Sequence, residues 1–462
     1  MAEDQAAQAD APKAAPEGTA AERIAAFAVG LRGAGVPEPV LHAATLHLLD
    51  AVGVGLAASA APHCAGWAGA AEPGAVPLLS GGTASPGSAA MLNGALIHAL
   101  EYDDTHTGSV VHGSAVAAPA ALAAGAEAGA TGREALLASV LAWEVAVRIG
   151  RAAPGAFQAR GFQATTVGGA VGAAAASAFL RGLDPVRIVS ALGIAGSEAS
   201  GTLAFLSDGA TVKALNPGWA ARTGLTAARL AEVGMTGPAD ILEGRFGVMA
   251  AFAGIEDGLG TELSDLGDRW HLPDAAFKLW PCCHYIHPFL EALGGLVREG
   301  LAAPDILSLT VHVPPPMVPL ICEPWARRQA PATGYDGKWG LPWCLAVLLT
   351  DGAVTVESFE AAPRAEVTAL ARRMEWVAMA GHGFPDRFAA RIEVETVSGR
   401  HVAEVASVLG GPGRPVPDEA IRAKFRANAA RRLPPPSVDR LEAALLGLAE
   451  APDLSELTAA LG

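Results

Sequence analysis

Hydrophobic residues return at helical spacing through the first half of the chain. From about Glu22 to Phe252, alanine and leucine dominate this pattern, and few stretches alternate between apolar and polar residues as strands do. Asp184-Pro185 and Asn216-Pro217 each place a capping residue before a proline, so each pair predicts the start of a helix. The pattern predicts helices at residues 39–56, 91–100, 115–130, 133–152, 165–180 and 185–195.

Strand patterns occur beyond about Trp270. Residues 306–313 alternate as in a strand, and residues 391–397 and 401–408 are also strand-like. The residues between the last two segments predict a hairpin turn. Helical patterns lie between the first strand and this hairpin, and they return near the chain end, at residues 339–350, 356–371, 418–432, 437–449 and 454–461.

This order of patterns predicts a mainly α fold. We expect a large all-helical domain formed by both chain ends, residues 21–269 and 412–462, with an inserted α+β lid domain over residues 270–411. Residues 1–20 are acidic and rich in alanine, and they lack the basic start and apolar core of a signal peptide. We therefore expect a disordered tail there.

Composition and charge narrow the classes of partner. The 462 residues are 51% hydrophobic, which allows a large core, and no apolar run reaches the roughly 18–20 residues of a membrane span without a glycine, proline or charge. A net charge of −15 argues against nucleic acid, because phosphate binding needs clustered lysine and arginine. Five cysteines, two of them adjacent, do not form a disulfide framework, so we expect a cytoplasmic location.

The most distinctive segment spans residues 276–288 and reads Ala-Phe-Lys-Leu-Trp-Pro-Cys-Cys-His-Tyr-Ile-His-Pro. Lys278 lies between apolar neighbours in a chain with 17% charged residues, so we expect its amine to be partly desolvated. A desolvated ammonium is tolerated where an anion pairs with it. The segment therefore suggests a site for an anionic substrate that carries a carboxylate.

The same segment offers four side chains that can bind metal, namely Cys282, Cys283, His284 and His287. Zinc sites favour a C-x2-C pair with a second ligand pair elsewhere, and adjacent cysteines rarely bind one ion. We therefore expect no metal. The alternative interpretation is a turn at Pro281 that leads into a helix, with the cysteines packed as small hydrophobic residues.

A second polar cluster follows the apolar helix predicted at residues 91–100. It reads Glu101-Tyr102-Asp103-Asp104-Thr105-His106 and continues with His112-Gly113-Ser114. One interpretation is a loop that anchors substrate and transfers protons. The other is a capped helix end with solvated acids. We favour the loop, because His112 opens another apolar helix whose N-terminal dipole attracts an anion.

A third polar segment, residues 161–168, places Gln163 and two threonines at the start of a small-residue helix. The backbone amides at such a start can bind a carboxylate. Taken alone, however, the pattern favours Thr165 or Thr166 as a simple helix cap.

Lys213 is the one lysine between Lys13 and Lys278, which indicates a specific anionic partner in a helical domain rich in alanine. A solvated lysine on the surface is the alternative. The nearby Asn216 is explained by its predicted position as a helix cap.

These segments, in this order, resemble the MmgE/PrpD family, which includes 2-methylcitrate dehydratases, cis-aconitate decarboxylases and iminodisuccinate epimerases. The resemblance spans roughly residues 20–450 and implies the two domains described above, an active site between them, a homodimer, and no metal or organic cofactor. The matching segments are residues 100–105 with His112-Gly113-Ser114, 161–168, 213–224 with Glu243-Gly244, 278–287 and 335–341.

Carried over residue by residue, the resemblance places Asp104, Thr105, His112, Lys213 and Lys278 at active-site positions. The chemistry shared by the family is the loss, gain or inversion of a proton beside a carboxylate. The resemblance implies that the lysines hold the carboxylate and stabilise enolate-like charge. It also implies that His112 carries the proton.

The chain departs from the family at four positions in the expected pocket. Glu101 stands where decarboxylase-like members have aspartate, and Gln163 and Asn216 stand where the family has histidine. Trp343 aligns with an expected tyrosine, and we expect these four residues and His284 to bind substrate. Amides do not transfer protons near neutral pH, and the pocket has lost potential positive charge and gained an indole. A tricarboxylate would be poorly neutralised there, so we expect a substrate with fewer carboxylates and a more apolar body.

The sequence therefore favours a cofactor-independent lyase that hydrates, dehydrates or decarboxylates a small carboxylate substrate through an enolate-like intermediate. The first alternative is an isomerase or epimerase, or an intramolecular cyclase, that moves a proton next to the carboxylate. The second is a non-catalytic member that binds a ligand in the same cleft. Neither nucleic acid nor a membrane is an expected partner.

Overall fold

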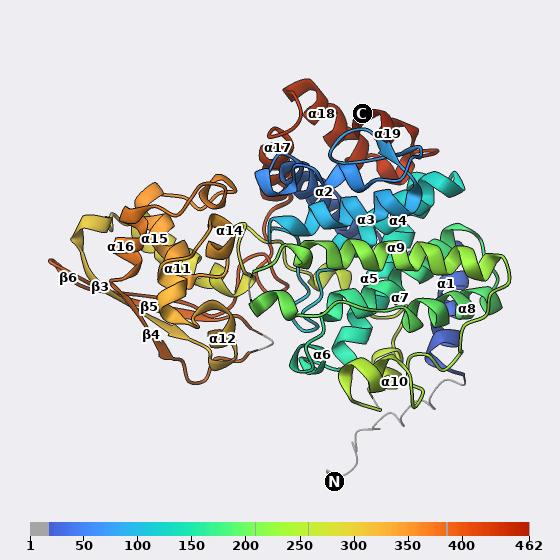
Figure 1. Cartoon of the computed structure of the whole chain (residues 1–462), viewed down its shortest axis with the longest axis horizontal. Helices are drawn as coiled ribbons and strands as arrows, with labels where there is room; N and C mark the ends of the chain where they lie inside the picture. The colour runs from blue at the N-terminus through green and yellow to red at the C-terminus, as the bar shows by residue number, and fades with distance from the viewer. Residues whose placement is uncertain (1–17, 208, 257, 385–386, 462) are drawn as a thin grey trace, which may run out of the picture.

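The computed structural model describes residues 18–461 except residues 208, 257 and 385–386 (Figure 1). Residues 1–17 of the predicted disordered tail lie outside the described residues. Helix α1 (Ala20–Ala34) begins within the last residues of that predicted tail. Thr19 caps it by accepting a hydrogen bond from the Glu22 amide, and the Glu22 side chain accepts one from the Thr19 amide.

Two hydrophobic cores organise the chain (Figure 1). The first collects buried residues between Ala20 and Phe277 and again between Ile421 and Leu457, so both chain ends pack into one helical unit. The second collects buried residues between Cys282 and Val408 in an α+β unit. The mainly α fold with a small sheet is confirmed, while the domain boundaries near residues 270 and 411 stay a prediction.

The helical unit is built around α9, which lies against α3, α7 and α8. Helix α17, from the end of the chain, packs against α2, and helix α5 packs against α7. Besides α1, this unit contains α2 (Glu38–Ser59), β1 (Val76–Pro77), β2 (Thr83–Ala84), α3 (Pro86–Ala99), α4 (Ser114–Ala128), α5 (Gly132–Ala152), α6 (Ala156–Ala159), α7 (Ala164–Leu180), α8 (Pro185–Ser197), α9 (Val212–Glu232), α10 (Leu259–Glu262), α17 (Asp418–Ala429), α18 (Pro435–Leu446) and α19 (Ser455–Leu461).

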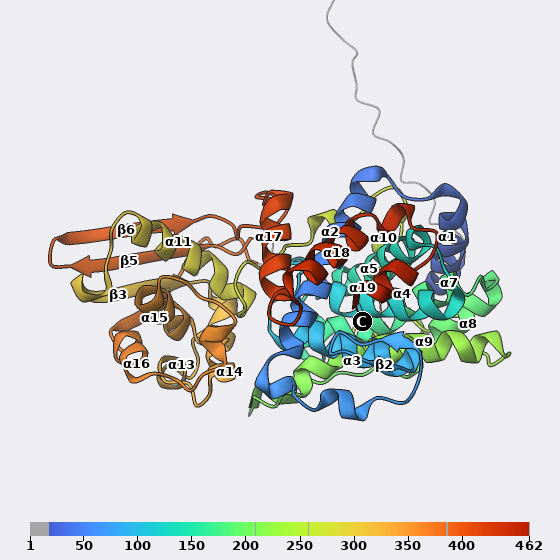
Figure 2. The ribbon, with the colours of Figure 1, turned by 90° about the horizontal axis from the view of Figure 1, so that it is seen from above.

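The α+β unit holds a sheet of strand order β4-β3-β5-β6. Strand β3 pairs in parallel with β4 and antiparallel with β5, and β5 pairs antiparallel with β6. Helices α13, α15 and α16 gather on one side of the sheet (Figure 2). The elements are α11 (His287–Arg298), β3 (Ile306–Val313), α12 (Val318–Ile321), α13 (Trp325–Gln329), α14 (Gly334–Gly337), α15 (Leu341–Asp351), α16 (Ala365–Ala371), β4 (Met374–Ala378), β5 (Ala390–Thr396) and β6 (Gly399–Val405).

The three predicted strands and their hairpin are confirmed, with a tighter turn. Thr396 pairs with Gly399 and Glu395 with Arg400, so Gly399 and Arg400, predicted in the turn, lie within β6. Strand β4 is missing from the prediction, because a short edge strand takes its parallel partner from a distant part of the chain. The predicted helix at 356–371 is also wrong in part: a short turn at Glu357–Phe359 and α16 replace it, with a proline between them.

Of the two predicted proline starts, one is confirmed and one is wrong. Asp184 caps α8 by accepting a 2.9 Å hydrogen bond from the Arg187 amide. By contrast, α9 already begins at Val212, so Asn216 and Pro217 lie inside the helix and Asn216 is not a cap. The backbone stays helical at Pro217 because the next residue, Gly218, packs directly on α3. This tertiary contact outweighs the local preference of proline for a first turn.

Helix α2 is, within the described residues, the one helix long and apolar enough to cross a membrane. Its most apolar window is 89% buried inside the protein. A core helix of a folded domain passes the same test of length and composition, so the helix is explained by its packing against α3, α5 and α17.

The crossing of α3 and α9 leaves no room for a side chain at Gly218, where an added Cβ would lie 1.9 Å from the Met91 carbonyl oxygen. We predict that Gly218→Ala lowers the free energy of unfolding by about 3 kcal/mol, the upper end of the usual cost of overpacking. Gly30→Ala is the control, because nothing lies within 4 Å of a Cβ at this exposed position in α1. It should stabilise the protein by about 0.5–1 kcal/mol. Urea unfolding followed by circular dichroism measures both; wild-type stability of Gly218→Ala would contradict the described crossing.

Candidate active site

The loop between α3 and α4 carries the polar cluster that the sequence singles out, and it is strained. Glu101 (φ 55°) and Val110 (φ 56°), both in this loop, are the non-glycine residues with positive φ in the described part of the chain. A left-handed conformation costs a residue with a side chain about 1–2 kcal/mol. Such strain tends to concentrate at functional sites. Thr105 and Ala276 also exchange two backbone hydrogen bonds of 3.0 and 2.8 Å, which tie the loop to the segment leading to Lys278.

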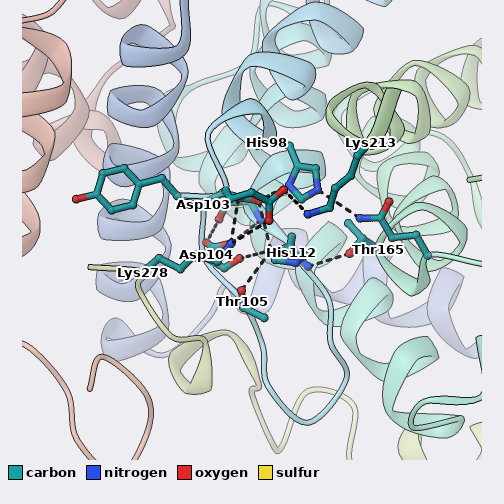
Figure 3. A network of polar contacts seen from close by, with 12 residues as sticks. His98, Asp103, Asp104, Thr105, His112, Thr165, Lys213 and Lys278 are labelled. Carbon is teal, nitrogen blue, oxygen red and sulfur yellow. Dashed lines mark hydrogen bonds and ion pairs between the residues drawn. The ribbon is translucent and has the colours of Figure 1, made fainter. Parts of the chain in front are cut away.

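His112 presents one free ring nitrogen (Figure 3). Its Nδ1 lies 2.9 Å from the Asp104 carbonyl oxygen, which can only accept, so we assign the Nδ1 proton to that bond. Nε2 is then unprotonated, and no residue that the structure describes bonds to it. The backbone amide of His112 donates to Thr165 Oγ1 at 3.0 Å. Burial lowers the pKa of His112 to about 3, so the ring is a neutral base at pH 7.

Two carboxylates and two lysines face each other beside this ring. Lys213 forms an ion pair with Glu101, while Lys278 Nζ lies 3.8 Å from Glu101 Oε2 and 3.7 Å from Asp103 Oδ1. His112 Nδ1 lies 3.5 Å from the other oxygen of Asp103, so Lys278 and His112 flank one carboxylate.

Ion pairing keeps these groups charged despite burial. Burial raises the pKa of Glu101, but Lys213 and Lys278 outweigh it and lower that pKa to about 2. Burial also opposes ionisation of Asp103, yet His98 and Lys278 hold its pKa well below the usual range. For Lys278, burial favours the neutral amine, but Asp103 and Glu101 raise its pKa above the ordinary value. Two ammonium groups therefore balance two carboxylates, and the cluster as a whole is close to neutral.

The N–H donors of the Lys278 ammonium form no hydrogen bond with the described residues. Lys278 is fully buried, and no acceptor among the described residues lies within hydrogen-bond reach of Nζ. Asp103 Oδ1 is likewise buried without a hydrogen bond. An ammonium carries three donors, and leaving them unsatisfied in the interior is costly. The arrangement therefore suits a ligand oxygen that completes the bonds of Lys278.

A chain of hydrogen bonds through two amides and one imidazole ends at the Asp103 carboxylate. Asn216 Nδ2 donates to Gln163 Oε1 at 2.9 Å, and Gln163 Nε2 donates to His98 Nε2 at 3.3 Å. His98 Nδ1 then donates to Asp103 Oδ2 at 2.7 Å. Two of the residues expected to bind substrate, Gln163 and Asn216, thus fix the tautomer of a histidine that the sequence analysis did not select.

The side chains of Thr165 and Asp104 hold the loop. The predicted capping roles of Thr165 and Thr166 are wrong, because Gln163 occupies the cap position of α7 and makes no side-chain cap bond. Thr165 instead accepts from the His112 amide. The Asp104 carboxylate points away from the His112 ring and accepts from His47 at 2.7 Å and from the Ser114 hydroxyl. Its side chain therefore positions the start of α4.

His284 lies in the same buried region, and Trp343 does not. Both ring nitrogens of His284 are buried without a hydrogen bond in the described part of the chain, and its ring packs against His287 and Phe388. Burial lowers the pKa of His284 well below its ordinary value. Trp343 sits in the second core and lines a separate pocket with Asp351 and Arg364. Its expected role in substrate binding stays a prediction without a contact to the cluster.

The interpretation of residues 276–288 as a turn before a helix is confirmed. Residues His284–Ile286 form a short 3-10 turn, and α11 begins at His287. Cys282 and Cys283 are buried in the second core as small hydrophobic residues.

One donor set in the cluster has the spacing to hold a metal ion: the ligand atoms of His98, Asp103 and His112 lie within 4.8 Å of one another. However, His98 and Asp103 already share a 2.7 Å hydrogen bond, and the Lys278 ammonium lies 3.7 Å from the same carboxylate. A positive charge at this distance disfavours a second cation. The set is therefore better suited to acid–base chemistry than to metal binding.

A pocket opens next to Lys213, between the two units. It is small, with a cavity volume of about 30 Å³, and its lining includes Leu206, Arg327, Arg328 and Trp339. The Lys213 ammonium lies 5.2 Å from the centre of the Trp339 ring. Asp336 also lines this pocket and pairs with both Arg327 and Arg328, so the two arginines leave little unpaired positive charge there.

Two residues of this region, His98 and Lys338, were not predicted from the sequence, and Asp103 was predicted only as a member of the second polar cluster. His98 and Asp103 form the supporting pair described above, and Lys338 donates hydrogen bonds to the carbonyl oxygens of Leu100 and Pro281, each at 2.8 Å. The rarity of lysine was the available signal, because the chain has five and Lys338 lies within a segment that carries the family resemblance.

Buried neutral histidines make the protein sensitive to acid. Burial lowers the pKa of His106 to about 3, from an ordinary value of 6.5. The unfolded chain therefore binds more protons between these values, and stability should fall as the pH is lowered, by about 1.4 kcal/mol per pH unit for each such histidine. His106→Gln should reduce the slope by about that amount in urea unfolding between about pH 4 and pH 6. His42→Gln, at the surface, is the control; an unchanged slope in His106→Gln would contradict a buried neutral ring.

Comparisons with known proteins agree with this architecture. Residues 22–257 match the model of the MmgE/PrpD N-terminal domain, and residues 280–449 match that of the MmgE/PrpD C-terminal domain. The cis-aconitate decarboxylase-like protein oryM of Aspergillus oryzae is 30% identical, over 96% of this chain and 97% of that protein. Cis-aconitate decarboxylase of Aspergillus terreus is 29% identical over 91% of each chain, and that of Homo sapiens is 27% identical over 81% of this chain and 79% of its own length. The chain belongs to the MmgE/PrpD family.

Proposed function

We propose that this chain is a cofactor-independent lyase that hydrates, dehydrates or decarboxylates a small carboxylate through an enolate-like intermediate. The observation that carries the proposal is the buried Lys278 ammonium, which has no hydrogen-bond acceptor among the described residues and shares Asp103 with His112. A substrate carboxylate would accept from Lys278 while Nε2 of His112 takes or gives a proton at the neighbouring carbon. Names of the similar proteins support a lyase that acts on carboxylates.

In dehydration, Nε2 of His112 removes the proton beside the carboxylate, and the C–H electron pair forms an enolate that Lys278 and Lys213 stabilise. The enolate then expels the hydroxyl from the next carbon, and the imidazolium returns the proton so that water leaves. In decarboxylation, the C–C bond to the departing carboxylate breaks and its electron pair forms the same enolate. Protonated His112 then delivers a proton to the carbon, aided by the substrate carboxylate, which raises the pKa of the ring.

The balanced charge of the cluster sets the kind of substrate. Lys213 is already paired with Glu101, and Lys278 lies between Glu101 and Asp103, so little positive charge remains for several carboxylates. Gln163 and Asn216 add no charge, because their amides are neutral and bond to each other and to His98. We infer a substrate with fewer carboxylates and a more apolar body than cis-aconitate.

An isomerase or epimerase is the second candidate, and one observation favours it. Besides His112, a second imidazole, His284, lies in the buried region with both nitrogens unbonded among the described residues. Two imidazoles can exchange a proton on opposite faces of one carbon. The predicted homodimer and cytoplasmic location stay expectations beside either candidate.

Solvent-deuterium NMR tests the proposed reaction directly. Incubation in D2O with a panel of mono-, di- and tricarboxylates should place deuterium beside a carboxylate in the product of a hydration or decarboxylation. A dehydratase or an epimerase should instead place it in recovered substrate, when the enolate is protonated again. Lys278→Met and His112→Asn should each lower the rate by about 10²–10⁴-fold, the usual worth of a proton carrier or a charge stabiliser. His401→Gln, in the exposed β6 strand, is the control. Wild-type rates in both variants would reject the site, and a wild type silent on the whole panel would favour the ligand-binding alternative.

Restoring the histidines of the family should move the preference back towards tricarboxylates. The double variant Gln163→His/Asn216→His adds two groups that can become cationic beside His98. We expect kcat/KM for cis-aconitate, relative to a monocarboxylate, to rise about tenfold, which corresponds to about 1.4 kcal/mol. Gln163→Ala/Asn216→Ala removes the same hydrogen bonds without adding charge and should not raise the ratio. An unchanged ratio in the histidine variant would contradict the charge argument.

A further inference from the structure

The four lysines in the described part of the chain converge on one loop. All four are buried, and each contacts residues 100–103. Lys213 and Lys278 pair with side chains of the loop, whereas Lys338 and Lys424 donate to its backbone carbonyls. The proposed reaction uses the first two lysines and assigns no role to the other two.

Lys338 and Lys424 each donate to the backbone carbonyl of the residue just before one of the two acids, Glu101 and Asp103. Lys338 Nζ donates to the Leu100 carbonyl oxygen at 2.8 Å, and this peptide group sets φ of Glu101, which is 55°. Lys424 Nζ donates to the Tyr102 carbonyl oxygen at 2.8 Å, and this peptide group precedes Asp103. A left-handed residue persists where its surroundings hold it in place. Each acid that faces Lys278 is therefore preceded by a peptide group anchored to an ammonium.

Lys338 also reaches the segment that carries Lys278. The same Nζ donates to the Pro281 carbonyl oxygen at 2.8 Å, and the Lys338 carbonyl accepts from the Cys283 amide at 2.9 Å. One ammonium thus joins the end of α3, in the helical unit, to the segment before α11, in the α+β unit.

This arrangement is costly, which argues that it serves a purpose beyond packing. Lys338 is 1% exposed and forms no ion pair with a carboxylate in the part of the chain that the structure describes. Burial lowers its pKa to about 8, with Glu101 opposing the shift. A methionine would fill a similar volume without the cost of burying a charge.

We propose that Lys338 is a positioning residue that sets the separation of Glu101 and Lys278. By holding the Leu100 and Pro281 carbonyls on one ammonium, it fixes the strained Glu101 backbone and brings Lys278 opposite the two acids. It acts through these residues and contacts no reacting atom. Lys424 supports the same loop from α17, with Asp50 as its counter-ion.

Amide hydrogen exchange of Lys338→Met, measured on the full chain by mass spectrometry, tests this without any substrate. We expect exchange to accelerate about tenfold or more at residues 101–105 and 278–283, with the rest of the protein unchanged. Arg364→Met is the control, because Arg364 pairs with Asp351 on the surface of the α+β unit, and it should leave both segments protected. Unchanged exchange in the two segments, or an equal acceleration throughout the α+β unit, would overturn the proposal.

Where Lys338→Met does not fold, Lys338→Ala prepared with propylammonium replaces it. The free cation can occupy the space of the missing side chain, so its removal by dialysis should accelerate exchange at the same two segments. Exchange rates in the two segments that are the same with and without the cation would overturn the proposal.

Enzyme kinetics of Lys338→Met, which rest on the proposed function, distinguish a positioning role of Lys338 from a purely structural one. We expect Lys338→Met to lower kcat about 100-fold, the effect of a small misplacement of catalytic groups, while KM changes by about threefold or less. A lysine that only stabilises the fold would leave kcat of the folded fraction unchanged, and that result would also overturn the proposal. If the wild type turns over no acid, the proposed function fails, and the exchange measurement still decides the role of Lys338.

Discussion

The burial of four ammonium groups around residues 100–103 is the constraint on which the rest of the site depends. Charges removed from water are tolerated where partners compensate them. These lysines come from α9, from the segments before α11 and after α14, and from α17, so elements far apart in sequence must meet at one loop. The strained backbone at Glu101 is stable only within such a frame. The fold thus supplies a rigid, water-poor cluster before any ligand arrives.

The balance of charge in this cluster is the basis of both the proposed chemistry and the proposed selectivity. Glu101 and Asp103 neutralise Lys213 and Lys278 as a group, yet the Lys278 donors stay without an acceptor in the described residues. One carboxylate can therefore be bound by hydrogen bonds without a large excess of positive charge. Gln163 and Asn216 fit this balance of charge, because their amides fix the tautomer of His98 through hydrogen bonds and contribute no charge. A neutral His112 with a free nitrogen completes a minimal set for moving a proton beside a carboxylate.

The sequence predicted those features that depend on local pattern or on rare residues. Helical spacing gave most helices of the first unit, and the isolation of Lys213 and Lys278 pointed to anionic partners. It failed where a distant part of the chain decides the outcome. Asn216 has the local context of a cap, but the packing of α9 on α3 places it inside a helix. The pairing of His98 with Asp103, the two backbone bonds of Lys338 and the parallel edge strand β4 likewise depend on contacts that no periodicity encodes.

The central claim is that the cluster binds one carboxylate through Lys278 and offers little positive charge for more. Ligand-observed NMR with two unreactive acids, butanoate and tricarballylate, tests it most directly on the wild type and on Lys278→Met. We expect butanoate to bind the wild type more tightly than tricarballylate does. We also expect Lys278→Met to lose butanoate binding. Tighter binding of tricarballylate, or equal binding of butanoate by the two proteins, would contradict it.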